Sequence, residues 1–166
     1  MAGPKDELRD VIDQLSEDQA QTALRWLGVL ARKDPGEAGP QSVGTLGDAL
    51  GMETVAREPG RSRMRMEVDP VWHNPNGVLH GGVIYTMVDY SMGSAVQPDL
   101  PEGEYCATIE AKINYLSAVR EGTLTVDTEV VKQGRNIAFT ESKVTDEQGK
   151  LVATGSGTIF IIRASQ

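Results

Sequence analysis

Residues 83–96 constrain the fold of this chain most, because they read VIYTMVDYSMGSAV and are apolar on nearly every side. One face shows residues at helical spacing, at Ile84, Met87, Val88, Ser91, Met92 and Ala95. The other faces carry a single charged residue, Asp89. A helix of this composition is buried on most of its sides. The sequence therefore predicts a domain built around one long central helix.

Strand patterns flank this helix in the sequence. Apolar and polar residues alternate over residues 61–69, and four β-rich segments follow the helix, at 105–115, 123–133, 136–145 and 151–162. Short turns with glycine separate the last of these segments, as hairpins require. We predict an α+β fold, in the order strand, central helix and four-strand meander, with an antiparallel sheet wrapped around the helix. Because one sheet covers one side of the helix, we expect a second subunit to cover the other.

The segment 105–115 shows a marked alternation. Strict alternation places six side chains on one face, those of Tyr105, Ala107, Ile109, Ala111, Ile113 and Tyr115. It places four on the opposite face, those of Thr108, Glu110, Lys112 and Asn114. We therefore expect Thr108 and Lys112 to share the polar face of this strand.

Residues 5–33 predict a pair of amphipathic helices. Ser16 and Gln19 fit a capping box at the start of the second helix. Over residues 1–33, five basic residues stand against six acidic ones, whereas a helical pair that reads DNA is usually basic. We expect this extension to pack on the body of the protein or on a neighbouring subunit.

Residues 33–44, KDPGEAGPQSVG, are rich in proline, glycine and acid and are typical of a linker. They divide the chain into an N-terminal helical extension with its linker, residues 1–41, and a main domain, residues 42–166.

The composition argues against several classes of function. The chain has 166 residues and a net charge of −8, which disfavours nucleic acid as a partner. Its start, MAGPKDELRD, lacks the apolar core of a secretory signal, and no apolar run approaches the ~20 residues that span a bilayer. A single cysteine fits a reducing compartment, so we expect a cytoplasmic protein without a membrane span. Two histidines, seven residues apart, and one cysteine predict no metal site.

Glycines and both histidines gather in the loop that leads into the central helix, HNPNGVLHGG at residues 73–82. Backbone N–H groups at a helix start have no partner within the helix, and the helix dipole favours negative charge there. Inside the helix, Asp89 is unusual, because aspartate is a poor helix former and is costly to bury. The segment therefore combines a candidate oxyanion-binding helix start with a candidate general base or nucleophile.

This combination resembles a known family. The pattern Asn-x-x-Gly-x-x-His-Gly-Gly, with an aspartate nine positions after the histidine, is similar to that of the hotdog-fold acyl-CoA thioesterases of the PaaI-like branch. The residues that carry it are Asn74, Gly77, His80, Gly81, Gly82 and Asp89. The later segments NYLSAVREGTL, KQGRNIAF and GKLVATGSGTIFI are also similar, so the resemblance covers about residues 43–162.

The resemblance implies that the chain hydrolyses an acyl-CoA thioester to the free acid and CoA. The N–H of Gly81 would polarise the thioester oxygen, with Asn74 and His80 shaping that site. Asp89 would act as general base or nucleophile, and Thr108 would help to position water. The implied substrate-binding residues are Gly82, Lys112, Arg120, Lys132, Arg135 and Asn136. Coenzyme A is part of the substrate here, so no separate cofactor is expected.

Two residues of this implied site lie too far apart within one chain to act on the same thioester group. Gly81 and Asp89 are eight residues apart on the predicted helix, which is roughly 12 Å along its axis. A carbonyl group held by the Gly81 N–H lies within ~3 Å of it, so Asp89 of the same chain cannot activate the attacking water. Two antiparallel helices related by a two-fold axis would remove this difficulty. We therefore expect a homodimer with shared active sites, assembled further into a tetramer as a dimer of dimers.

Two alternative functions remain open. A hotdog hydratase would use an aspartate and a histidine on one helix, and no histidine follows Asp89. A non-catalytic hotdog protein would bind acyl-CoA as a signal and read DNA through the N-terminal helical pair. The acidic N-terminus and the presence of Asp89 favour the thioesterase.

Overall fold

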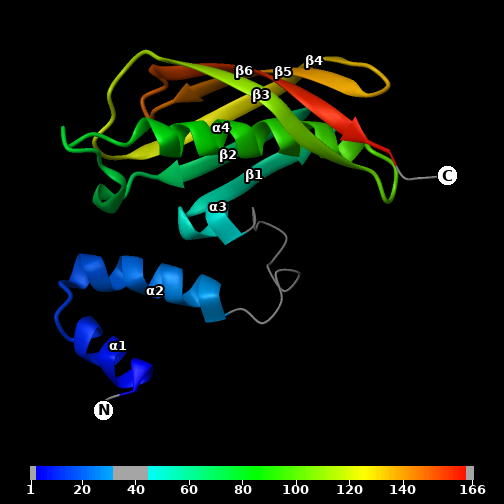
Figure 1. The fold of residues 1–166 in the computed structure, drawn as a ribbon. Coiled ribbons are helices and arrows are strands. Elements are labelled where there is room, and N and C mark those ends of the chain that lie inside the picture. The colour runs from blue at the N-terminus through cyan, green and yellow to red at the C-terminus, as the bar shows by residue number, and fades with distance from the viewer. Residues whose placement is uncertain (1–2, 32–44, 164–166) are drawn as a thin grey trace.

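The computed structural model describes residues 3–31 and 45–163. Its helices are α1 (Pro4–Ile12), α2 (Glu17–Ala31), α3 (Thr45–Ala49) and α4 (Gly81–Val96), with short 3-10 turns η2 (Pro70–Trp72) and η3 (Gln97–Asp99). Its strands are β1 (Met52–Glu58), β2 (Arg61–Glu67), β3 (Tyr105–Tyr115), β4 (Thr123–Gln133), β5 (Ile137–Thr145) and β6 (Leu151–Ile162). These strands form one antiparallel sheet that curves around α4 (Figure 1), which confirms the predicted α+β architecture.

The central helix α4 is buried along the predicted face. Its buried side chains are Ile84, Met87, Val88, Ser91, Met92, Ala95 and Val96. Glycines on β6 let the helix lie directly on the sheet. A Cβ added to Gly155 would meet Cγ1 of Val88 at 2.7 Å, and one added to Gly157 would meet the sulfur of Met92 at 2.6 Å. Glycine weakens a strand, so its presence here marks the close approach of the helix.

A chain of buried hydroxyl groups ties α4 to three strands. The Ser62 hydroxyl of β2 donates to the Ser91 carbonyl oxygen over 2.6 Å. The Thr128 hydroxyl of β4 lies 2.8 Å from Oγ of Ser91 and 2.7 Å from Oγ of Ser142 on β5. All four side chains are buried, and a buried hydroxyl left without a partner costs about 1–3 kcal/mol. The network therefore favours one rotation of the helix against the sheet.

The order of the strands corrects one part of the prediction. The strands β4, β5 and β6 form a meander, but β3 pairs with the far side of β6 and β2 pairs with β4. A four-strand meander that includes β3 was therefore wrong. Because α4 crosses the concave face of the sheet, the chain reaches the opposite edge before β3 begins. The strand β4 then returns to the place beside β2, and the edge strands β1 and β3 flank α4 from two sides.

The edge strand β1 was missed by the sequence analysis. It forms a hairpin with β2 through Pro59 and Gly60, and Gly60 has a φ of 73°. A Pro-Gly pair suits a type II turn, which needs a positive φ at its second central residue. A register shift between Thr54 and Ala56 interrupts the strand. The period-two pattern that reveals the other strands is therefore lost in this segment.

A β-bulge at Ile109 corrects the predicted faces of β3. The pairing with β6 shifts register between Thr108 and Glu110. As a result Thr108 turns toward α4, while Lys112 lies opposite Ser156 on the outer face of the sheet. The expectation that Thr108 and Lys112 share a face was wrong, because one extra residue moves all later side chains to the other face.

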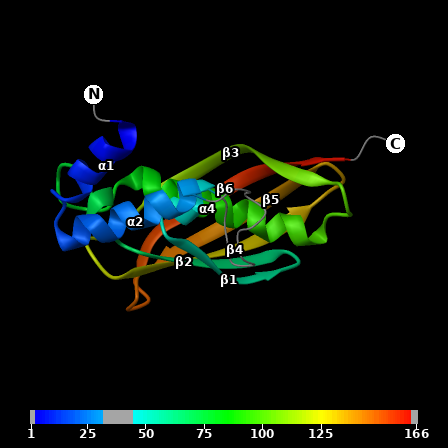
Figure 2. The same ribbon diagram turned by 90° about the horizontal axis from the view of Figure 1, so that it is seen from below.

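The N-terminal extension forms the two predicted helices, α1 and α2. The Ser16 amide donates to Oε1 of Gln19 over 2.9 Å, and Oγ of Ser16 accepts from the Gln19 amide over 3.3 Å, which confirms the capping box. Thr22 and Arg25 of α2 both donate to the carboxylate of Asp69. The extension thus packs on the body of the protein, near the start of α4 (Figure 1, Figure 2).

Only some of the apolar side chains of the two N-terminal helices pack on the body of the protein. Trp26 packs against Trp72, with ring centroids 5.7 Å apart, whereas Leu24 is 64% exposed and Val11 of α1 is 55% exposed.

The linker predicted at residues 33–44 and the domain boundary near Ser42 lie outside the described residues. No helix in the described residues is long and apolar enough to cross a membrane.

Replacing Gly155 with alanine should destabilise the protein by about 1–3 kcal/mol, because the added methyl group overpacks against the β-branched side chain of Val88. Urea unfolding at a fixed protein concentration measures this change. Ser156→Ala, on the exposed side of the same strand, is the matched control and should shift stability by less than about 0.5 kcal/mol. An unchanged unfolding midpoint for Gly155→Ala would mean that α4 does not press on this strand.

Candidate active site

The loop before α4 is held by its own hydrogen bonds. The Asn74 amide donates to the Val78 carbonyl oxygen, and the Asn74 carbonyl oxygen accepts from the Gly77 amide. Oδ1 of Asn74 accepts from the Asn76 amide over 2.9 Å, as in an Asx turn. Gly77 has a φ of 68°, a conformation that glycine adopts without strain. Asn74 therefore fixes the path of the loop that leads to the start of α4.

His80 caps the first turn of α4. Its Nδ1 accepts from the Gly82 amide over 2.9 Å, and its own amide donates to the Trp72 carbonyl oxygen. A Cβ on Gly82 would meet Nδ1 of His80 at 3.0 Å. Glycine at this position therefore lets the imidazole lie over the end of the helix.

The Gly81 amide is an available donor at this helix start. The next amide, that of Gly82, bonds to His80, but the described residues supply no hydrogen-bond acceptor for the Gly81 N–H. Beside it, the Tyr115 hydroxyl of β3 donates to the Gly81 carbonyl oxygen over 2.9 Å. Burial and the neighbouring Tyr85 raise the pKa of Tyr115, so its phenol stays protonated at neutral pH and keeps this bond. The helix start thus presents one free N–H at its positive end.

Asp89 lies on the side of α4 that the sheet leaves partly open. The Thr108 hydroxyl donates to Oδ1 of Asp89 over 2.7 Å, so the structure brings these two predicted residues together. Both side chains line a depression of about 290 Å³, which also includes Gly93 and Gln97 from the C-terminal half of α4. The described residues supply no hydrogen bond to Oδ2 of Asp89, so this oxygen is available to accept a proton from water.

Two further residues of this depression were missed by the sequence analysis. Cys106 lies two residues before Thr108 on β3, and its Sγ is 3.7 Å from the Gly93 carbonyl oxygen. Burial raises the pKa of the Cys106 thiol, while Arg57 opposes and Asp89 adds to this effect. A neutral thiol is a weak nucleophile, which argues against Cys106 as a candidate nucleophile. Arg57 was missed together with β1, and the Pro-Gly turn after it is the signal that reveals this strand.

The two halves of the predicted site are separate within one chain. Gly81 is the first residue of α4, and Asp89 comes eight residues later, about 12 Å along the axis. Neither Asn74, His80 nor Gly81 lines the depression at Asp89. One chain therefore presents a carboxylate half-site and an N–H half-site at different positions along the same helix.

The predicted coenzyme-binding side chains do not gather in one place. Lys112 lies on the outer face of β3, and Arg120 precedes β4. Lys132, Arg135 and Asn136 lie at the far end of β4, in and beside its turn into β5, and a strand of this length spans about 35 Å. These groups are separate in one chain, so their binding of coenzyme phosphates stays a prediction.

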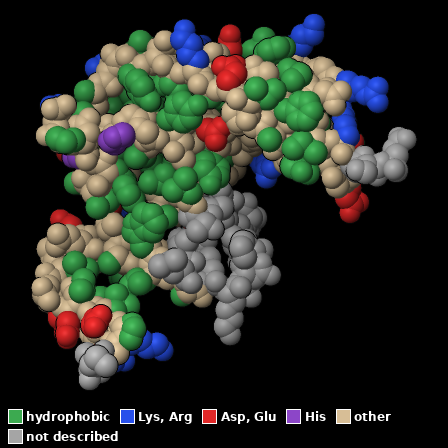
Figure 3. All heavy atoms as spheres, in the orientation of Figure 1, with side chains coloured by type: hydrophobic (Ala, Val, Ile, Leu, Met, Phe, Trp, Pro, Cys, Tyr) green, Lys and Arg blue, Asp and Glu red, His purple; other side chains and the backbone are tan. Residues whose placement is uncertain are grey.

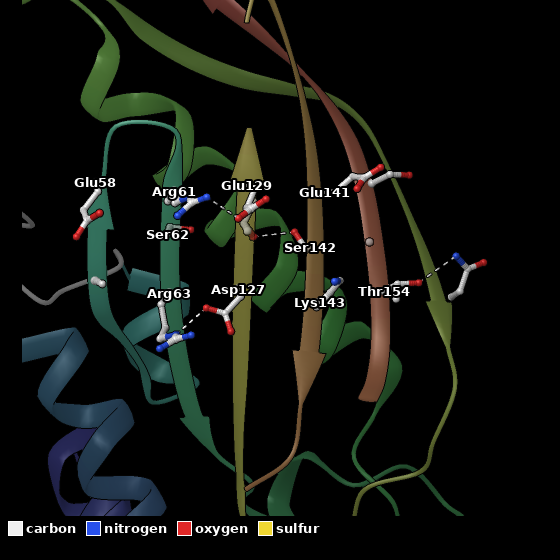
Figure 4. Close-up of a pocket in the computed structure, with 15 residues that line it drawn as sticks. Glu58, Arg61, Ser62, Arg63, Asp127, Glu129, Glu141, Ser142, Lys143 and Thr154 are labelled. Carbon is white, nitrogen blue, oxygen red and sulfur yellow. Dashed lines mark hydrogen bonds and ion pairs between the residues drawn. The ribbon is translucent and has the colours of Figure 1, made fainter. Parts of the chain in front are cut away.

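A second hollow lies on the face of the sheet opposite α4. It encloses about 800 Å³ and is lined by charged side chains of neighbouring strands (Figure 4). Arg63 and Asp127 pair across strands at 2.6 Å, and Arg61 and Glu129 pair at 3.0 Å. Asp127 also raises the pKa of Arg63 through its hydrogen bond and charge. Because these charges compensate each other and no predicted site residue lines this hollow, the depression at α4 is the better candidate for an active site.

Within the part of the chain that the structure describes, no three His, Cys, Asp or Glu side chains lie close enough together to hold a metal ion.

Comparison with known proteins identifies the family to which the chain is similar. Residues 76–153 match the model of the thioesterase superfamily, a range that includes the start of α4, Asp89 and Thr108. Acyl-coenzyme A thioesterase 13 of Homo sapiens is 31% identical over 106 residues, which cover 63% of this chain and 75% of that protein.

Solved structures share the fold. The BH2602 protein of Bacillus halodurans, solved with CoA, superposes with a TM-score of 0.79 and 25% identity, over 95% of this chain and 99% of that one. The likeness therefore reaches into the N-terminal helices. A variant of the phenylacetic acid degradation protein PaaI from Thermus thermophilus gives a TM-score of 0.64 and 25% identity, over 69% of this chain and 96% of that one. The chain therefore belongs to the thioesterase superfamily, as a hotdog-fold thioester hydrolase of the PaaI-like branch.

Proposed function

We propose that this chain hydrolyses an acyl-CoA thioester to the free acid and CoA, with Asp89 as the catalytic carboxylate. The observation that carries this proposal is the Thr108 hydroxyl, which holds one oxygen of Asp89 at 2.7 Å beside an open depression. The partner of Asp89 is a hydroxyl group rather than a histidine, which favours hydrolysis over hydration. The similar BH2602 protein was solved with CoA, which supports a CoA thioester as the substrate.

The proposed reaction needs a base, a water molecule and a donor for developing negative charge. Asp89 takes a proton from water while the water oxygen bonds to the thioester carbon, and the carbonyl oxygen becomes negative. The free N–H of Gly81, at the positive end of α4, stabilises that oxygen. Breaking of the carbon–sulfur bond then releases the CoA thiolate, which takes up the proton from Asp89, so that the free acid and CoA leave and the carboxylate is restored.

We propose that the base and the N–H donor come from two subunits of a homodimer. The edge of β3 that faces away from β6 pairs with no strand in the described residues. Apolar side chains beside it are exposed, with exposed fractions of 39% for Tyr85, 57% for Ile109 and 52% for Tyr115. Hydrophobic side chains also gather on the face that carries α4 and β3 (Figure 3). A free edge strand beside an apolar patch favours pairing with another chain.

A two-fold axis at this edge would place two copies of α4 antiparallel to each other. The start of one helix would then lie beside the middle of the other, which unites Gly81 of one protomer with Asp89 of the partner subunit. We further propose that two such dimers form a tetramer and that the protein acts in the cytoplasm, where its single cysteine would stay reduced. The mass of the protein in solution distinguishes a dimer from a tetramer.

Asp89→Asn should lower kcat about 10²–10⁴-fold, because the amide keeps the shape of the side chain but cannot act as a base. Release of free thiol from an acyl-CoA measures turnover, and equilibrium binding of the same thioester should stay close to that of the unchanged protein. Thr108→Val removes only the hydroxyl that holds Asp89 and should lower kcat less than Asp89→Asn does. Turnover of Asp89→Asn near that of the unchanged protein would refute the assignment.

Gly82→Ala should lower kcat about tenfold, equivalent to about 1.4 kcal/mol in the barrier. The added Cβ would meet Nδ1 of His80 at 3.0 Å, so the imidazole must leave the helix start and the first turn must adjust. Gly28→Ala on α2, where an added Cβ meets nothing within 4 Å, is the matched control and should keep full turnover. Full turnover of Gly82→Ala would show that the His80 cap does not contribute to the site.

Mixing of two inactive variants tests the shared sites. Asp89→Ala and Asn74→Ala should each be weak alone, because every site of either homodimer carries one defect. In a mixed dimer one site carries both defects and the other carries none, so activity should return toward half of the unchanged level. A mixture shown by mass to contain mixed dimers, but with no regained activity, would contradict shared sites.

A further inference from the structure

The depression at Asp89 is lined by a mixture of polar and aromatic side chains. Besides Asp89 and Thr108, its side-chain lining includes Arg57, Tyr90, Ser94, Gln97 and Cys106. Sites that bind apolar ligands are lined predominantly by hydrophobic and aromatic side chains, with few polar groups. In the part of the chain described, no aliphatic side chain lines this depression. The lining therefore offers hydrogen-bond partners to an acyl group that carries a polar substituent.

Arg57 reaches this depression from the edge of the sheet opposite β3. It pairs across the β1–β2 hairpin with Ser62, whose hydroxyl bonds to Ser91 of α4, so this side of the hairpin faces the helix. Its charge also acts on Cys106, which lies on β3 at the other side of the depression. Arg57 and Thr108 thus approach the exposed side of α4 from opposite edges of the curved sheet.

The guanidinium of Arg57 has no carboxylate partner among the described residues. The arginines of the adjacent strand β2 differ in this respect, because Arg63 pairs with Asp127 at 2.6 Å and Arg65 pairs with Glu53 at 2.8 Å. A guanidinium offers a planar fork of N–H donors that fits a carboxylate in two parallel hydrogen bonds. Arg57 is therefore a cation that is available to a ligand next to the catalytic carboxylate.

We propose that Arg57 selects acyl groups that end in a second carboxylate, so that the preferred substrates are CoA monothioesters of short dicarboxylic acids. This inference rests on the proposed thioesterase function and names its substrate class. In one chain the depression encloses about 290 Å³, so the part of the acyl group that it receives is short, since sites for drug-sized molecules enclose roughly 300–1,000 Å³. With the thioester carbon at Asp89, the distal carboxylate lies at Arg57, and Ser94 and Gln97 offer further hydrogen bonds.

The test compares pairs of thioesters that match in chain length but differ in the distal carboxylate. Glutaryl-CoA is paired with valeryl-CoA and adipyl-CoA with hexanoyl-CoA, and kcat/KM is measured by thiol release after subtraction of spontaneous hydrolysis. The unchanged protein should prefer the dicarboxylic member of each pair by about tenfold to a hundredfold, as expected of a charge-assisted hydrogen bond. Arg57→Gln should remove this preference, because it lowers kcat/KM for glutaryl-CoA and adipyl-CoA much more than for valeryl-CoA and hexanoyl-CoA. Arg57→Lys should keep part of the preference, because it keeps the charge but loses the fork.

Arg65→Gln is the matched control, because it removes an arginine of the same hairpin that already pairs with Glu53. It should keep the full preference for the dicarboxylic thioesters. If Arg57→Gln lowers kcat/KM equally for both thioesters of a pair, Arg57 holds the coenzyme phosphates that both substrates share. That result would overturn the inference. Hydrolysis of the monocarboxylic thioesters without any preference would overturn it too and leave the proposed function intact. Absence of hydrolysis with every thioester, including aromatic and long-chain ones, would overturn the proposed function itself.

Discussion

The covering of α4 is the constraint on which the rest of this structure depends. The helix carries apolar residues on nearly every face, and one curved sheet buries only the side that includes Met87 and Met92. The hydroxyl network around Ser91 and the glycines of β6 fix the rotation of the helix in this position. With that rotation set, Asp89 must face the gap between the two edges of the sheet. The same packing that builds the core therefore presents the carboxylate to a ligand.

The N-terminal extension is connected to this arrangement through the loop before α4. Asp69 accepts hydrogen bonds from Thr22 and Arg25 of α2 and also caps the short turn η2 by accepting from the Val71 amide. Trp72, at the end of that turn, packs on Trp26 and accepts the amide of His80 through its carbonyl oxygen. A continuous set of contacts thus runs from α2 to the capping residue of α4. The extension packs beside the half-site that presents the free N–H, and it does not reach the carboxylate half-site through these contacts.

Much of the fold can be predicted from the sequence, because period and turn chemistry are local. The burial of α4, the β-rich segments and the Ser16 capping box each follow from residues close together in the chain. Strand order does not follow in this way, because the place of β3 beside β6 depends on how α4 crosses the sheet. The bulge at Ile109 also lies beyond pattern reasoning, because residues 105–115 alternate in sequence although the pairing shifts there. In β1 the register shift removes the alternation that would reveal a strand.

The residues of the candidate site also differ in whether the sequence alone reveals them. Asp89 and the glycines before α4 stand out in the sequence because each breaks a local rule, a charge inside an apolar stripe and flexible residues at a helix start. Thr108 was assigned to the correct strand and lies beside Asp89, as the resemblance implies, but the sequence pattern placed it on one face with Lys112, and the bulge at Ile109 separates the two. Arg57 could not be found without β1, whose strand pattern is interrupted.

The central claim is that a complete site requires two chains, since Gly81 and Asp89 are about 12 Å apart along one helix. The most direct measurement is specific activity over a series of protein dilutions, with the molecular mass determined at each concentration. Specific activity should fall in proportion to the fraction of protein that remains dimeric or larger, and isolated folded monomers should release no thiol above background. Monomers that keep the full specific activity would contradict the account.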